Sequence, residues 1–188
     1  EAVRSFQEAA AHDPGAAMPW WGIAFANGMN INLPEVTEAQ WKAGREAAER
    51  ALALLDEESE IERALVEAAA ARTAWPPPED QRPYDEAYAA AMKDVHDRFS
   101  DNADVAALYA ESLMNLQPWD YWTSDLEPKG RTEEFIAVLE GALKGDPTHP
   151  QAAHLYIHAL EAGPNPAKAE AAADMLRDRV PAAGHLVH

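Results

Sequence analysis

The chain has 188 residues, among them 33 Asp and Glu, 15 Lys and Arg, seven His and no Cys, and its formal net charge is −18. This charge argues against binding to nucleic acid or to an anionic membrane surface, because both require a basic surface. The absence of cysteine excludes disulfides, thiolate-bound zinc and a cysteine nucleophile. No apolar run reaches the roughly 18–20 residues of a membrane-spanning helix.

Composition and capping motifs predict a soluble all-α protein. The chain has 41 alanines but only 13 valines and isoleucines, whereas β-sheets favour β-branched residues. Thr37-x-x-Gln40 and Ser59-x-x-Glu62 are capping boxes, and Asn165 precedes a proline at a first helical position. The predicted helices cover residues 2–11, 17–30, 38–56, 60–74, 83–99, 103–116, 132–144, 149–162 and 166–179.

The connections and the two ends of the chain predict how these helices are organised. Short turns separate most of the segments, which is typical of antiparallel helix pairs. The chain starts inside a helical pattern with no N-cap residue before it, and it ends shortly after Gly184, where another helical pattern begins. We therefore expect a piece of a longer protein that is incomplete at both ends.

An internal repeat connects several of the predicted helices. Three segments share one spacing of small or apolar residues that ends in a proline: Ala2, Phe6, Ala9 and Pro14; Phe135, Leu139, Ala142 and Pro147; and Ala169, Ala173, Leu176 and Pro181. Pro147 and Pro181 are 34 residues apart, and Trp20, Ile23 and Ala24 follow Pro14 where the first helix of a repeat would begin.

On these residues the chain resembles the tetratricopeptide repeat (TPR) family, in which a 34-residue helix–turn–helix unit repeats into a solenoid. The resemblance implies one TPR-like α-solenoid domain over residues 1–188, with about four to five helix pairs. A generic antiparallel helical bundle is the alternative. The segments around His154 and His185 are also similar to a bacterial subgroup with histidine-bearing C-terminal repeats, which makes the bacterial cytoplasm the default expectation for location.

Two segments depart from a plain repeat. Trp75-Pro76-Pro77-Pro78 is predicted to stop a helix, because proline lacks the backbone donor and clashes with the preceding turn. Residues 117–131 form an inserted loop with three aromatic residues, Trp119, Tyr121 and Trp122. Loops of this length are uncommon in compact domains and are often functional. We expect the loop to fold back onto the helices, where it either fills a gap between repeats or covers a pocket.

The histidines near the C-terminus are the candidate metal ligands. His154 and His158 are four residues apart on one predicted helix and share a face with Glu161, a spacing that suits two imidazole ligands on one ion. The TPR resemblance places these three residues, together with His185 and His188 of the next repeat, at positions that line the concave groove. Imidazoles with one carboxylate suit one divalent Zn, Cu, Ni or Fe ion.

The same family positions imply the rest of a ligand-binding groove. Its N-terminal part is aromatic and apolar, with Trp21 and Phe25, and its C-terminal part is polar, with Glu111 and Asn115. Trp119 and Trp122 of the inserted loop complete the candidate residues.

Two functions follow as expectations from these residues. One is a TPR-like scaffold that binds a peptide or protein partner in the groove, and the acidic charge favours a basic partner. The other is a metal-binding protein or metal-dependent enzyme that uses the five histidine-cluster residues. No catalytic residue can be named, and phosphate-binding and dinucleotide-binding motifs are absent from the sequence. End-to-end self-association through the open ends of the solenoid is a further expectation.

Overall fold

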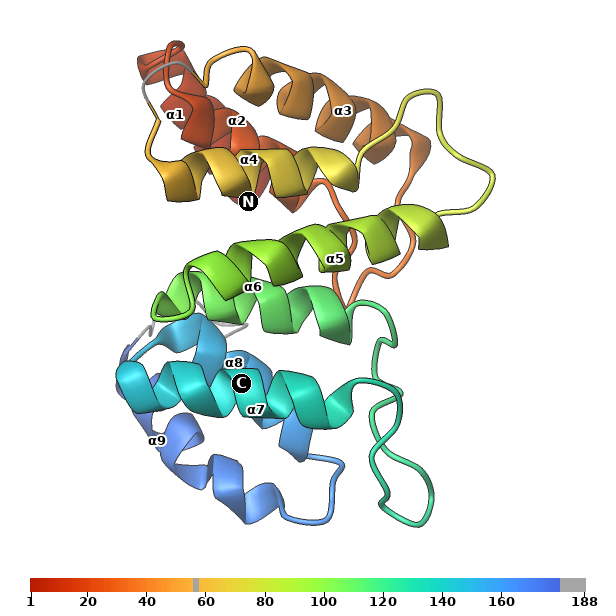
Figure 1. The fold of residues 1–188 in the computed structure, drawn as a ribbon, viewed down its shortest axis with the longest axis vertical. Helices are drawn as coiled ribbons and strands as arrows, with labels where there is room; N and C mark the ends of the chain where they lie inside the picture. Colours follow the sequence, from red (N-terminus) through yellow and green to blue (C-terminus); the bar gives the residue numbers. More distant parts are fainter. Residues whose placement is uncertain (56–57, 180–188) are drawn as a thin grey trace. The chain divides into compact units, whose positions relative to one another are not determined.

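The computed structural model describes residues 1–55 and 58–179, and within these ranges the chain is all-α (Figure 1). It contains nine α-helices and one 3₁₀ turn, and the described residues form no strand. In chain order these are α1 (Ala2–His12), α2 (Ala17–Ala26), α3 (Glu38–Leu52), α4 (Glu60–Ala71), α5 (Arg82–Arg98), α6 (Ala103–Met114), α7 (Thr132–Gly145), α8 (Pro150–Leu160), η1 (Pro166–Ala169) and α9 (Glu170–Arg179).

The chain divides into two compact units, Glu1–Val95 and His96–His188, which we call unit 1 and unit 2. In unit 1, α1 packs on α2, α2 on α3 and α3 on α4, and α2 also contacts α4. Unit 2 repeats this order, since α6 packs on α7, α7 on α8 and α8 on α9, while α6 also contacts α8. The predicted all-α fold with consecutive helices packed in order is therefore confirmed. The single TPR-like domain stays a prediction.

The predicted helix starts agree with the structure better than the predicted helix ends do. Both predicted capping boxes form, at Thr37 and at Ser59, with reciprocal hydrogen bonds to Gln40 and Glu62. Hydrogen bonds from Ser59 also lower the pKa of Glu62. Asn165 and Pro166 stand at the N-cap and at the first helical position, as predicted, although the side chain of Asn165 makes no capping hydrogen bond and the segment begins as a 3₁₀ turn.

The predicted helix 17–30 is too long, since α2 ends at Ala26. The side-chain amide of Asn27 donates to the carbonyl oxygen of Ile23 at 2.8 Å and terminates the helix there. The predicted helix 60–74 likewise ends early, at Ala71, where the hydroxyl of Thr73 bonds the carbonyl oxygen of Ala70 at 2.9 Å. The triple-proline segment lies in the connection that follows, outside any helix, as predicted.

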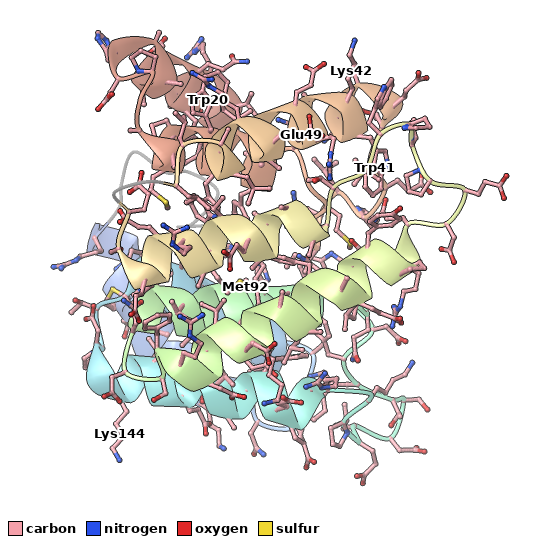
Figure 2. All side chains as sticks on the ribbon, turned by 45° about the horizontal axis from the view of Figure 1, so that its top comes forward. Trp20, Trp41, Lys42, Glu49, Met92 and Lys144 are labelled. Atoms are coloured by element: carbon pink, nitrogen blue, oxygen red, sulfur yellow. The ribbon has the colours of Figure 1, made fainter. Side chains whose placement is uncertain are left out.

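Small side chains allow the helices of unit 1 to pack closely. Its core includes a cluster of mainly alanine residues from α1, α2 and α3: Ala10, Ile23, Ala24, Ala47 and Ala48. On α3, Trp41 is buried, and its ring contacts that of Tyr84 edge to face with the ring centres 5.5 Å apart. Lys42 and Glu49 of the same helix are exposed (Figure 2). The high alanine content of the chain therefore serves close helix packing.

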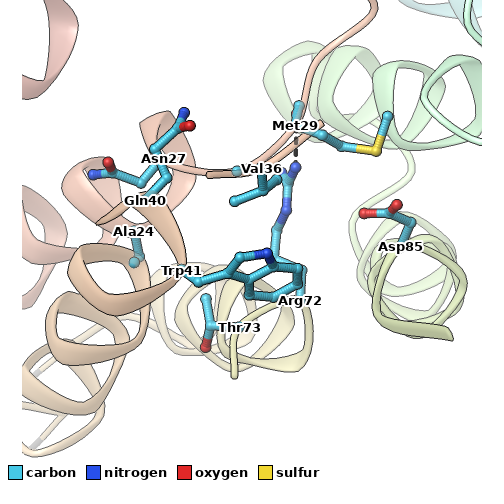
Figure 3. A pocket seen from close by; sticks show the side chains of 11 residues that line it. Ala24, Asn27, Met29, Val36, Gln40, Trp41, Arg72, Thr73 and Asp85 are labelled. Atoms are coloured by element: carbon cyan, nitrogen blue, oxygen red, sulfur yellow. Dashed lines mark hydrogen bonds between the residues drawn. The ribbon is translucent and has the colours of Figure 1, made fainter. Parts of the chain in front are cut away.

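Unit 1 also buries one arginine at the end of α4. Arg72 is only 4% exposed, and its Nη2 donates to the carbonyl oxygen of Met29 at 2.7 Å (Figure 3). Its guanidinium lies 4.5 Å from the ring centre of Tyr88 and 5.8 Å from that of Phe25. Burial raises the pKa of Asp85, and the charge of Arg72 opposes that shift. The cavity around these groups measures about 10 Å³, which is room for about one water molecule.

Candidate functional site

The candidate site lies in unit 2, where α6 and α8 pack side by side. Both helices begin with side-chain caps: Asn102 accepts from the amide of Val105 on α6, and His149 accepts from the amide of Ala152 on α8. The Nε2 atom of His149 also lies 2.9 Å from a carboxylate oxygen of Asp104. The contact between His149 and Asp104 joins the first turns of the two helices.

The predicted histidine pair of α8 is buried and in contact. His154 and His158 are 6% and 7% exposed, and their ring centres lie 4.5 Å apart at nearly a right angle. The Nδ1 atom of His158 lies 2.8 Å from a carboxylate oxygen of Glu161. Because an ionised carboxylate only accepts hydrogen bonds, this contact places a proton on Nδ1 of His158. Glu161 therefore orients the ring of His158 through that nitrogen.

The inserted loop (residues 117–131) is held closed by the side-chain amide of Gln117 at its start. Nε2 of Gln117 donates to the carbonyl oxygens of Asp120 and Lys129 at 3.1 and 3.0 Å, and its Oε1 accepts from the amide of Arg131 at 3.1 Å. Lys129 and Asp120 also form an ion pair. Gly130 has a φ of +52°, and a Cβ atom there would collide with the Gln117 amide. These contacts bring the two ends of the loop together.

The inserted loop packs onto α8, as the sequence predicts. The indole N–H of Trp122 donates to the carbonyl oxygen of Ala159 at 2.9 Å, and Gly163 leaves room for this ring, since a Cβ atom there would lie 2.6 Å from it. The ring of Trp119 meets that of His158 edge to face at 4.9 Å and is 49% exposed. The loop thus lies beside the histidine pair. Its role as the cover of a pocket stays a prediction.

A buried oxygen atom without a hydrogen-bond partner among the described residues also lies at this site. Asn115, the C-cap residue of α6, is 4% exposed, and its Oδ1 makes no hydrogen bond with any described residue. Tyr121 is also buried, at 2% exposed, and its hydroxyl lies beside the backbone of Trp119. Burial raises the pKa of Tyr121 to about 12, and the nearby charges of Glu111 and Glu161 add to that shift while the backbone of Trp119 opposes it.

Seven of the predicted site residues lie on these two helices or in the connections beside them, and two further residues there were not predicted. Glu111, Asn115, Trp119, Trp122, His154, His158 and Glu161 all belong to α6, α8 or the connections beside them. Tyr121 was predicted only as an aromatic residue of the loop. Gln151, whose side-chain amide lies 3.3 Å from a carboxylate oxygen of Glu111, was not predicted. The position of Gln151 along its helix is a signal that could have indicated it, because Gln151 is the second residue of α8 as Asp104 is of α6.

The remaining predicted site residues lie elsewhere. Trp21 and Phe25 are on α2 in unit 1, where their rings stack at 5.4 Å with an angle of 12° between the planes. His185 and His188 lie outside the described residues. Within residues 1–55 and 58–179, no group of three His, Asp or Glu side chains is arranged to hold a metal ion.

No family model matches the chain, and no curated protein matches it. Among the helices that the structure describes, none is both long and apolar enough to cross a membrane.

The tyrosines of unit 2 give a testable pH dependence. Burial is the larger cause that raises the pKa of Tyr156 to about 12, and a hydrogen bond to Glu140 adds to the shift. Burial and a hydrogen bond to Glu134 also raise the pKa of Tyr109. Because the folded state favours the protonated hydroxyls, these tyrosines make their full contribution to the free energy of unfolding below about pH 10. This contribution is lost as the pH rises towards about 12. Urea unfolding followed by circular dichroism should show this decline. Tyr156→Phe should make the decline smaller, and an unchanged profile in that variant would contradict the prediction.

Proposed function

We propose that the chain is a helical-repeat scaffold that binds a peptide or protein segment along α6 and α8 in unit 2, beside the inserted loop. The observation that carries this proposal is the buried Oδ1 of Asn115, which has no partner among the described residues at a position expected to face the groove. Burying a polar group without a partner is costly. An N–H donor of a bound chain would satisfy this atom.

Packing and charge support the proposal. The first helices of successive pairs contact each other in both units, α2 with α4 and α6 with α8, as expected for a TPR-like groove. Residues 96–188 contain 15 Asp and Glu against seven Lys and Arg, and the sequences of α6 and α8 contain no Lys or Arg. This balance favours a basic partner.

An array of random-sequence peptides, probed with the purified chain, tests this function. Asn115→Ala removes the buried acceptor and is expected to weaken binding of the selected peptides about fivefold or more, as loss of one hydrogen bond does. Asn165→Ala is the matched control, because Asn165 is exposed and makes no capping hydrogen bond. Peptides that bind both variants as well as the parent chain, or no selected peptides at all, would contradict the proposal.

A second candidate function is metal binding at the histidine pair. The contact between Glu161 and Nδ1 of His158 favours it, because metal-binding histidines commonly present one nitrogen to the ion and the other to a carboxylate. In this arrangement His154 and His158 would supply ligands, Glu161 would orient one of them, and His185 and His188 are the proposed further ligands. Imidazole ligands suit Zn, Cu, Ni or Fe.

Elemental analysis of protein purified from metal-replete cells tests this second function. About one transition-metal ion per chain is expected if the histidines bind metal. His154→Ala and His158→Ala should each reduce that content, whereas His12→Ala, at an exposed position of unit 1, should not. Metal-free protein, or equal metal content in all three variants, would reject metal binding.

A further inference from the structure

We infer that unit 1 carries a binding site of its own, a groove between α1 and α3 that takes a small hydrophobic amine. The groove has a volume of about 450 Å³. Alanines of α1 and α3 line it together with Trp20 and Ile23 of α2, and its polar residues are Gln7 on one wall and Glu46 on the other. This site lies within unit 1, so it is separate from the scaffold function proposed for α6 and α8.

The packing of the first three helices leaves the groove open. α2 packs on both α1 and α3, whereas no Cα atom of α1 comes within 8 Å of one of α3, and both helices lie within the residues that the structure describes (Figure 1). Small side chains line both walls, Ala10 and Ala11 on α1 and Ala43 and Ala47 on α3. No large side chain at these positions fills the space between the two helices.

The floor of the groove is apolar and aromatic. Ile23 is buried and belongs to the alanine-rich core of unit 1, and Trp20 packs against that core while staying partly exposed (Figure 2). The indole N–H of Trp20 is buried and makes no hydrogen bond with a described residue, so no such bond fixes the orientation of the ring. A mostly apolar pocket of this volume, set between helices, is typical of small-molecule binding sites.

Glu46 supplies the charge at the groove. Its side chain is exposed on α3 and makes no ion pair with a described residue. Two basic neighbours on the same helix are engaged elsewhere, since Arg45 pairs with Glu49 and the ammonium of Lys42 lies 5.8 Å from the ring centre of Trp75. An ionised carboxylate only accepts hydrogen bonds. The groove therefore favours a ligand with a charged donor and opposes a ligand with a carboxylate.

These features define the chemistry of the ligand. An apolar body packs on the alanines and on Ile23, and a protonated amine at one end pairs with the carboxylate of Glu46. An ammonium group within about 6 Å of the indole face of Trp20 is also attracted by the ring quadrupole. Residues 1–95 contain 18 Asp and Glu against eight Lys and Arg, so the charge of the whole unit favours a cation as well.

Nuclear magnetic resonance titration with three related compounds tests the inference. The probes are 4-phenylbutylamine, 4-phenylbutan-1-ol and 4-phenylbutanoate, which share one apolar body and are positive, neutral and negative at about pH 7. The indole N–H signal of Trp20, assigned with Trp20→Phe, reports binding. We expect the amine to bind saturably with a dissociation constant of about 1 mM or tighter. The alcohol should bind about fivefold more weakly, and the carboxylate most weakly of all.

Substitutions that fill the groove locate the binding. Ala11→Leu and Ala43→Leu each extend one wall into the groove and should weaken amine binding about tenfold or more. Ala90→Leu makes the same chemical change at an exposed position of α5 that does not line the groove, and it should change binding less than about twofold. Neither Ala11 nor Ala43 is buried, so both variants are expected to fold, and thermal unfolding checks this.

Substitution of Glu46 tests the part played by charge. Glu46→Gln should weaken amine binding about fivefold and leave alcohol binding unchanged, because only the charged probe uses the carboxylate. Glu38→Gln, at an exposed position in the first turn of the same helix, should leave both unchanged.

Three results would overturn the inference: no binding of the amine, equal binding of the three probes, or amine binding that is unchanged in the groove-filling variants or in Glu46→Gln. None of these results affects the scaffold function, which is tested separately at Asn115 in unit 2.

Discussion

Replacing Gly130 by alanine is expected to lower the free energy of unfolding by about 2–3 kcal/mol and to release the inserted loop from α8. The backbone at Gly130 has a φ of +52°, which strains any residue with a Cβ atom. That Cβ atom would also displace the side-chain amide of Gln117, which bonds three backbone groups of the loop. Urea unfolding gives the stability, and quenching of Trp119 and Trp122 fluorescence reports the release.

The matched control is Gly141→Ala on α7, which makes the same chemical change. Gly141 is exposed, lies inside the helix and has no neighbouring atom within 4 Å of an added Cβ. Alanine there should raise the free energy of unfolding by about 0.5–1 kcal/mol, because it favours the helix over the unfolded chain. If both variants shifted stability in the same direction, the proposed role of Gly130 in closing the loop would be wrong.

Replacing Arg72 by alanine is expected to destabilise unit 1 by about 3 kcal/mol. The substitution empties a buried volume beside Tyr88 and leaves the carbonyl oxygen of Met29 without its donor. It also removes the positive charge that opposes the raised pKa of Asp85. Four of the six tryptophans lie in residues 1–95, so tryptophan fluorescence during urea unfolding follows this unit.

Two further variants define what the arginine contributes. Arg45→Ala removes an exposed arginine that pairs with Glu49 on α3, and surface pairs of this kind contribute less than about 1 kcal/mol. Arg72→Met refills the volume but not the hydrogen bond, so its loss should fall between those of the two alanine variants. A loss for Arg72→Ala no larger than that for Arg45→Ala would show that the buried arginine does not hold unit 1 together.

Local signals in the sequence were sufficient for the helices and for part of the site. The boxes at Thr37 and Ser59 involve residues three positions apart, so their chemistry is visible along the chain. The contact between His154 and His158 follows from one helical turn. Predictions of this kind succeed because the partners lie within a few residues of each other.

Contacts between distant residues could not be predicted in this way. Arg72 ends an alanine-rich helix, where a basic residue usually complements the helix dipole in solvent. Only the fold brings the carbonyl of Met29, 43 residues away, to its guanidinium. The hydroxyl of Tyr121 is similar, because its surroundings come from α6, α8 and the loop itself. At Asn165 the N-cap position itself was predicted, but the 3₁₀ turn that follows it was not.

The hydrogen bond between the indole of Trp122 and the carbonyl oxygen of Ala159 affects the order in which the helices of unit 2 unfold. Each pair in a helical repeat array ordinarily contacts only its neighbours, so such arrays fray one pair at a time from an open end. Here the connection between α6 and α7 adds a hydrogen bond to the last turn of α8, beyond the packing between the helices themselves. Local unfolding of α9 should therefore stop at α8, and the candidate site would outlast the helix that follows it.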